Sequence, residues 1–192
     1  MESPASSSPT SGPRGRTRRA ILDAAATVLA QNQAASLADV AAAAEVGRTT
    51  VHRYFPERSD LLRALGVDVL DKVAAATVRA RTEDGPAMAA LERLGQELFE
   101  LGESLTLVFD ESLAGTWKWE GWEDETEADR ALARLIDRGH AEGAFDTGLD
   151  QDWIVQVLWS LLYVAWQRGR DGGTKHEALT LCLRTLRKSV TS

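Results

Sequence analysis

The residues best suited to binding chemistry are grouped in one short segment, GRTTVHRY, at positions 47–54. An arginine there can bridge O6 and N7 of guanine, and a threonine can contact a thymine methyl group or a phosphate. At the start of a helix, such side chains would reach base edges in the major groove of DNA. A small core helix has little use for so many polar groups. The candidate DNA-contacting residues of this segment are Gly47, Arg48, Thr49, Thr50, His52, Arg53 and Tyr54.

The segment before it predicts a second short helix that would support the first. Ser36 and Asp39 have the spacing of a capping box at the start of an apolar helical pattern. Only two or three residues separate this pattern from Gly47. Pro56 ends the next helix, because the residue before a proline is pushed out of the helical region. Two short helices joined by a tight turn have the proportions of a helix-turn-helix.

Apolar residues at intervals of three and four indicate helices through most of the remaining chain, and the sequence shows neither a strand pattern nor an internal repeat. The expected fold class is therefore all-α, with about nine helices. One apolar stripe from Leu91 to Val108 predicts a helix over five turns. Besides the two short helices, the other expected helices cover about 17–32, 58–81, 125–140, 151–168 and 175–190.

Composition excludes several kinds of site. The chain has 192 residues, 44% of them hydrophobic, which is enough for a sizeable core. Its single cysteine, Cys182, excludes an intrachain disulfide and a multi-cysteine metal site, and it suits a reducing compartment. Three scattered histidines do not form a His-rich cluster. We therefore expect no metal and no cofactor.

The sequence also lacks the features of an enzyme or a membrane protein. It contains no phosphate-binding loop, no Gly-x-Ser-x-Gly and no local Cys-His signature, so catalysis is not expected. Its longest apolar stretch, residues 153–166, is shorter than the roughly 20 residues that a membrane-spanning helix needs. The N-terminus lacks the apolar core of a signal peptide. The simplest expectation is a cytoplasmic protein without a membrane partner.

The distribution of charge favours a local basic face. The net charge of the chain is −7. Residues 1–60 carry seven arginines and six acidic residues, whereas residues 61–192 carry 15 basic and 23 acidic residues. An acidic remainder limits non-specific binding while a local basic face attracts DNA. Residues 1–13 have the composition of a disordered tail, and the arginines after them, including Arg14 and Arg16, form either a DNA-contacting arm or a solvated linker.

Residues 18–65 resemble the N-terminal domain of the TetR family of transcriptional regulators. The matching features are an opening Arg-x-x-Ile-Leu-x-Ala-Ala, a Ser-Leu-x-x-Val-Ala, and the run Val-Gly-Arg-Thr-Thr-Val-His-Arg-Tyr-Phe-Pro-x-Arg-x-x-Leu-Leu. The resemblance implies a DNA-reading domain at 14–60 and a helical domain for ligand binding and dimerisation at 61–192. It also implies a homodimeric repressor that a small molecule releases from a near-palindromic operator.

The resemblance assigns roles to individual residues. Arg48, Thr49 and Thr50 match positions that read bases. Ser36 matches the residue that caps the supporting helix and is also a candidate DNA contact. His52, Tyr54 and Arg58 match positions that meet the phosphate backbone, Arg53 could serve either role, and Phe55 would lock the reading helix to the core. Two residues depart from the pattern. Glu45 stands where a turn glycine is usual, at a cost of about 1 kcal/mol if its backbone is left-handed. His52 replaces a tyrosine.

The second domain contains a candidate ligand site. All six tryptophans lie beyond residue 116. Aromatic faces beside carboxylates suit a cationic, planar or lipophilic small-molecule effector. Ordinary core packing is the alternative interpretation. The candidate ligand-contacting residues are Trp117, Trp119, Trp122, Glu111 and Phe109.

The last two expected helices also suggest a dimer interface. Residues 151–168 are apolar on nearly every side, and a protein of this size cannot usually enclose such a helix by itself. The candidate interface residues are Trp153, Val157, Trp159, Leu162, Trp166, Leu179, Leu183 and Leu186. Packing in the core and at the dimer interface together is the favoured interpretation of the three tryptophans of this group.

One alternative function is a helical adaptor whose helix-turn-helix binds protein instead of DNA. The polar surface formed by Arg48, Thr49 and Thr50 argues against it, because a groove that binds protein should be more apolar. Loss of binding at raised salt would favour DNA over this alternative.

Overall fold

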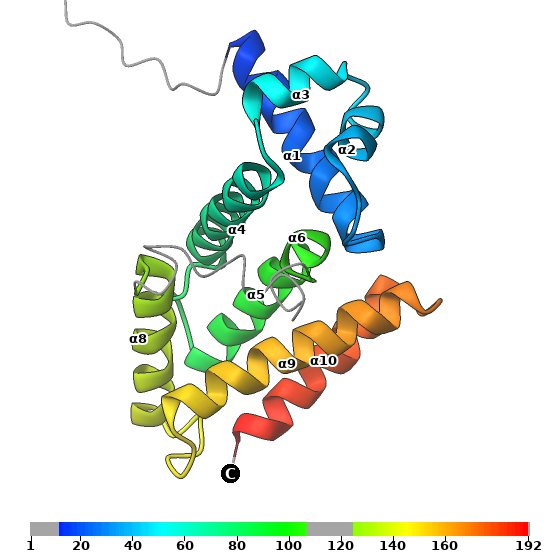
Figure 1. Ribbon diagram of the computed structural model, residues 1–192. Helices are drawn as coiled ribbons and strands as arrows, with labels where there is room; N and C mark the ends of the chain where they lie inside the picture. The colour runs from blue at the N-terminus through cyan, green and yellow to red at the C-terminus, as the bar shows by residue number, and fades with distance from the viewer. Residues whose placement is uncertain (1–11, 107–124, 192) are drawn as a thin grey trace, which may run out of the picture.

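The computed structural model describes residues 12–106 and 125–191, and these residues form helices and no strands (Figure 1). The expected all-α fold class is confirmed. The helices are α1 (Pro13–Gln31), α2 (Leu37–Ala43), α3 (Arg48–Tyr54), α4 (Arg58–Ala80), α5 (Ala87–Phe99), α6 (Gly102–Thr106), α8 (Glu127–Ala141), α9 (Gln151–Arg170) and α10 (Lys175–Val190).

Side-chain caps determine where several of these helices begin. Thr126 and Asp129 form a capping box at the start of α8, and Thr174 and Glu177 form another at the start of α10. Asp150 accepts a hydrogen bond from the backbone N–H of Trp153 and caps α9. Each cap satisfies backbone donors that the first turn of a helix leaves unpaired.

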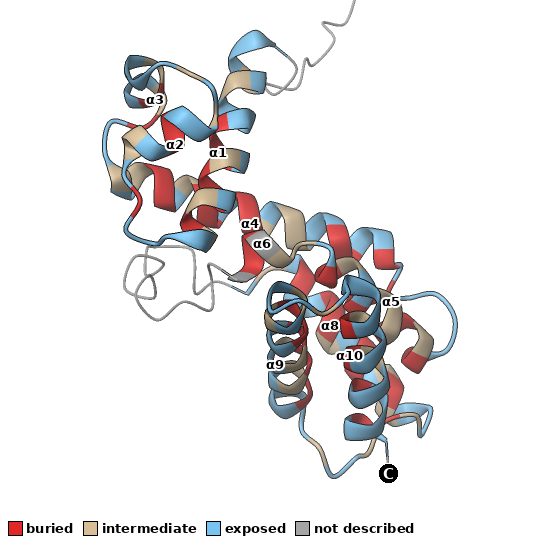
Figure 2. Ribbon diagram, turned by 90° about the vertical axis from the view of Figure 1, so that its right-hand side faces the viewer, coloured by how far each residue is buried: buried red, intermediate tan, exposed pale blue. Residues whose placement is uncertain are grey.

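Two separate hydrophobic cores lie on either side of the middle of α4 (Figure 2). The first core joins α1, α2 and α3 through residues such as Leu22, Val40 and Val51. The second joins α5, α8, α9 and α10 through residues such as Leu94 and Leu158. Helix α4 contributes to both cores and runs from one group of helices to the other (Figure 1). We call the α1–α3 unit the reading head, after the DNA-reading role that the resemblance implies for it.

The single helix expected over residues 91–108 is wrong, because the chain breaks between α5 and α6. The indole Nε1 of Trp166 donates to the carbonyl oxygen of Phe99 at 2.8 Å, and this carbonyl would otherwise accept a bond within a continuing helix. Gly102 then approaches the same indole so closely that an added Cβ would lie 2.7 Å from Cδ1 of Trp166. A tertiary contact therefore ends α5 although the apolar stripe continues.

Within the part of the chain that the structure describes, no helix is long and apolar enough to cross a lipid bilayer.

Substitution of Gly139 tests the tight packing of α8. A Cβ at this position would lie 2.1 Å from Cδ2 of the buried Phe145 ring, so Gly139→Ala must displace that ring. We expect the free energy of unfolding to fall by about 1–2 kcal/mol, after the helix-forming advantage of alanine is subtracted. Gly169→Ala is the matched control: it meets no atom within 4 Å and should raise the free energy of unfolding by about 0.5–1 kcal/mol. Urea unfolding measures both, and equal effects would contradict the packing argument.

Candidate DNA-binding surface

The supporting helix α2 begins at the expected capping box. The hydroxyl Oγ of Ser36 accepts from the backbone N–H of Asp39 at 3.3 Å, and Oδ2 of Asp39 accepts from the backbone N–H of Ser36 at 2.7 Å. These bonds hold the pKa of Asp39 below its ordinary value, with the backbone donor as the largest cause and the Ser36 hydroxyl next. Ser36 is exposed, but its hydroxyl is engaged in the cap.

The turn between α2 and α3 contains a residue with a left-handed backbone, Glu45, at the position where the TetR pattern usually has glycine. Glu45 has φ of 53°. The N–H of Glu45 donates to the carbonyl of Ala42 at 3.2 Å, and that of Val46 donates to the carbonyl of Ala41 at 3.0 Å. This pair of bonds is a Schellman motif, which closes the end of α2 and directs the chain into α3.

One face of helix α3 packs against the core of the reading head, and the opposite face is polar and exposed to solvent. Val51 and Phe55 anchor the packed face, because both are buried in that core. Gly47 is the N-cap residue, and its carbonyl accepts from the N–H groups of Thr50 and Val51. The exposed residues of α3 are Arg48, Thr49, His52 and Arg53, whereas Thr50 and Tyr54 are half-buried. The predicted polar residues therefore do share an outward surface on a rigid element.

The basic arm is the beginning of α1, since this helix already starts at Pro13. Arg14 and Arg16 are exposed on its first turns. The hydroxyl of Tyr54 donates to the carbonyl of Arg14 at 3.2 Å and links the arm to the last turn of α3. Figure 1 shows the first turn of α1 beside α3, at the end of the molecule far from α10. Two helices thus bring arginines to the same end of the reading head.

Arg58 lies differently from a residue that simply faces phosphate. Its guanidinium is half-buried and donates to the carbonyl oxygens of Gln33 and Ala35, the latter at 3.4 Å. Arg58 therefore fixes the loop that precedes α2.

His52 is exposed, with Nδ1 at 3.3 Å from the carbonyl oxygen of Pro56.

A network of charges between the reading head and the second domain was not found by sequence reasoning. Asp68 of α4 is only 9% exposed and pairs with Arg19 of α1 and with Nζ of Lys72 at 2.9 Å. Lys72 also donates to Oγ of Ser104 in α6 at 2.9 Å, and Arg19 binds Asp23. The hydrogen bond from Arg19 lowers the pKa of Asp23. The sequence did offer one signal of this charge network, because Asp68 and Lys72 are four residues apart and share one face of α4.

The candidate residues of the second domain fall into three groups. Trp117, Trp119, Trp122, Glu111 and Phe109 lie outside the described residues. Within α9 and α10, three candidate interface residues are buried in the core of their own chain, and five retain exposed surface. The buried ones are Leu162, Trp166 and Leu186. The others are Trp153, Val157, Trp159, Leu179 and Leu183.

The fold and the polar face of α3 define a helix-turn-helix regulator, and comparison with known proteins agrees. Residues 21–65 match the model of the bacterial regulatory proteins of the tetR family. The HTH-type transcriptional repressor LfrR of Mycolicibacterium smegmatis (strain ATCC 700084 / mc(2)155) is 39% identical over 182 residues, covering 94% of this chain and 93% of the relative. The chain belongs to the TetR family.

Solved structures support the same assignment. The TetR-like regulator LfrR from Mycobacterium smegmatis in complex with proflavine is 36% identical, with a TM-score of 0.69, and the match covers 92% of this chain and 98% of that one. The ketosteroid transcriptional regulator KstR2 of Mycobacterium tuberculosis has a TM-score of 0.73 at 20% identity over 95% of this chain and 96% of its own, which shows the shared fold.

The left-handed turn gives a matched pair of stability tests. Glu45→Gly removes the steric penalty of a side chain at positive φ and should raise the free energy of unfolding by up to about 1 kcal/mol. Ala44→Gly, one residue earlier at φ of −80°, should lower it by about 0.5–1 kcal/mol. Thermal or urea unfolding of both variants checks the sign. A loss of stability in Glu45→Gly would show that the glutamate is not strained.

Proposed function

We propose that the protein is a homodimeric repressor that reads a near-palindromic operator and is released from it by a small molecule. The observation that carries this proposal is the polar face of α3, which is held rigid by Val51 and Phe55 and carries Arg48 and Thr49 in the open. The repressor LfrR, 39% identical over nearly the whole chain, supports the direction of the regulation. A partner of this kind also implies a cytoplasmic location.

In the proposed complex, α3 lies in the major groove while α2 braces it against the backbone. Arg48 and the threonines after it are nearest to the base edges, because they occupy the first turn of α3. Arg14 and Arg16, tied to α3 through Tyr54, add contacts to neighbouring phosphates. Two reading heads of a dimer would meet half-sites about 34–36 Å apart.

The proposed dimer uses the outward stripe of α9. Trp153 is 53% exposed and Val164 is 62% exposed, and Val157 lies between them on the same side of the helix. An exposed apolar stripe of this kind is typical of an interface. A two-fold axis would place the same stripe of both copies in contact.

The proposed effector is a planar cationic or lipophilic molecule. The support is the 36% identical LfrR, whose structure was solved in complex with proflavine. The contacts that we propose are those predicted from the sequence: Trp117, Trp119, Trp122, Glu111 and Phe109. Effector binding would weaken DNA binding only by its difference in affinity between the two head spacings, typically about 1–3 kcal/mol.

Binding to DNA tests the proposed reading surface. Arg48→Ala combined with Thr50→Ala should weaken binding to an operator, selected from random DNA or taken from the region flanking the coding sequence, by about 10- to 100-fold. Arg184→Ala, which removes the same charge from exposed α10, is the control and should leave the affinity unchanged. Fluorescence anisotropy at several salt concentrations measures the loss and the salt dependence.

Equal affinity of wild type and the double variant would contradict the assignment of α3. A binding affinity that does not change with salt concentration would favour the alternative function, a helical adaptor that binds protein. Adding proflavine to the wild-type complex should release the DNA. Failure of that step alone would contradict the cationic effector and leave the DNA-binding assignment intact.

The dimer proposal is tested by placing a charge on α9. Val164→Glu should convert the dimer into a monomer, because a carboxylate cannot be buried in an apolar interface without a partner. Val78→Glu on α4 is the matched control, since Val78 is 76% exposed and lies outside the proposed interface. Sedimentation velocity distinguishes the two states. A Val164→Glu protein that remains a dimer would refute this interface.

A further inference from the structure

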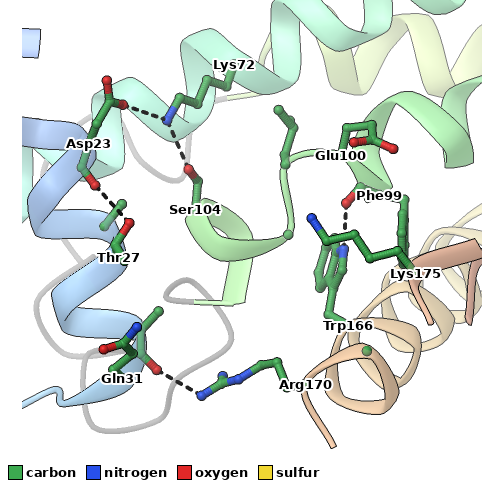
Figure 3. Close-up of a pocket in the computed structure, with 15 residues that line it drawn as sticks. Asp23, Thr27, Gln31, Lys72, Phe99, Glu100, Ser104, Trp166, Arg170 and Lys175 are labelled. Atoms are coloured by element: carbon green, nitrogen blue, oxygen red, sulfur yellow. Dashed lines mark hydrogen bonds and ion pairs between the residues drawn. The ribbon is translucent and has the colours of Figure 1, made fainter. Parts of the chain in front are cut away.

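A cavity of about 600 Å³ lies between the reading head and the second domain (Figure 3). Helix α1 forms one side of it, and α4, α6, α9 and the start of α10 form the others. Its volume is within the range of small-molecule sites, which is roughly 300–1,000 Å³. A molecule in this cavity would touch both parts of the protein at once.

Cationic groups reach into this space from three helices. Figure 3 shows Lys72, Arg170 and Lys175 directed toward it from α4, α9 and α10. Nζ of Lys72 pairs with Asp68 at 2.9 Å and with Asp23 at 3.9 Å. Arg170 donates to a neutral acceptor, the carbonyl oxygen of Ala30, at 3.1 Å. Among the described residues, Arg170 and Lys175 have no ion pair with a carboxylate.

Neither of the two acidic residues that line the cavity pairs with Arg170 or Lys175 within the described residues. Asp23 is bound by Arg19, which lies outside the cavity, and lies 3.9 Å from Nζ of Lys72. Glu100 is exposed, and its carboxylate is turned away from α1 in Figure 3. The open side of the cavity between Arg170 and Lys175 therefore has an excess of positive charge.

Apolar surfaces line the cavity behind these cations. Trp166 and Phe99 are buried residues of the second core, and a hydrogen bond between them fixes the indole. Ala26 and Ala30 of α1 form part of the opposite wall. A flat apolar body can be held between these walls, whereas a strongly hydrated ion could not use them.

We infer that this cavity binds a second kind of ligand, distinct from the effector proposed above: a small amphipathic anion, an aromatic or alicyclic carboxylate or sulfonate. The apolar body lies between Trp166 and the alanines of α1, and the anionic group lies between Arg170 and Lys175. Charge-assisted hydrogen bonds of this kind are the strong ones. The guanidinium that meets the anion leaves the carbonyl of Ala30, which removes one connection between α9 and the reading head. The effect on DNA rests on the proposed function, but the binding itself does not.

The test uses the anionic fluorophore 8-anilinonaphthalene-1-sulfonate on the full chain, with 2-naphthoate as a non-fluorescent competitor. The double variant Arg170→Gln with Lys175→Gln should bind the fluorophore at least about tenfold more weakly than the wild type, and 2-naphthoate should displace the fluorophore from the wild type. Arg168→Gln is the matched control on the same helix, because Arg168 is exposed and does not line this cavity. Thermal melting establishes that all variants fold.

The outcomes separate the site from its effect. Equal binding by the double variant and the control, or no displacement by 2-naphthoate, would overturn the site. Site-specific binding that leaves operator affinity unchanged would support the site and overturn its coupling to the reading head. A protein that binds no DNA at all would overturn the proposed function while leaving the result on the cavity valid.

Discussion

A nearly buried carboxylate, Asp68, connects the reading head to the rest of the protein. It accepts hydrogen bonds from Arg19 of α1 and forms an ion pair with Lys72. Lys72 in turn donates a hydrogen bond to Oγ of Ser104 in α6. Two cations offset the desolvation of this carboxylate, whose side chain is 11% exposed, while the side chains of Arg19 and Lys72 are 44% and 25% exposed. Three helices that the chain does not join directly, α1, α4 and α6, are therefore coupled through one charged group.

The contacts of Asp68 that couple these helices are polar, whereas the two cores on either side are apolar. On α4, the head core ends with Leu65 and the second core begins with Val69, so Asp68 lies at the boundary. Polar boundaries between domains allow relative motion more readily than a continuous apolar core. Because the pKa of Asp23 is lowered in the folded state, its contribution is present above the pKa of the unfolded chain and is lost as pH falls through the folded value. Acid therefore removes the stabilisation that the Arg19–Asp23 pair gives to α1.

Short-range features of the fold were predictable, and long-range ones were not. The capping box of Ser36 and Asp39 depends on neighbours within a few residues, so the sequence pattern predicts it. The left-handed backbone of Glu45 was raised as a condition only by the resemblance, which has glycine at this turn position. The break after α5 depends on Trp166, which is 67 residues from its acceptor Phe99. Arg19 and Asp68 are 49 positions apart, and Arg170 and Ala30 are 140 apart. No periodicity encodes such pairs, and for the same reason the inward turn of Arg58 was not foreseen.

The use of arginines in the head bears on how the proposed dimer would depend on the spacing of its two heads. Arg19 and Arg58 are engaged within the protein, so the arginines that remain for DNA lie on α3 and on the first turns of α1. Each phosphate that a cation neutralises contributes a limited, salt-dependent increment, so one head alone binds weakly. In the proposed dimer, the second head binds at the high effective concentration that the first provides, and this gain is lost when the spacing no longer matches the operator. In this proposal, a small movement at the polar junction around Asp68 would suffice for regulation, without any change in α3 itself.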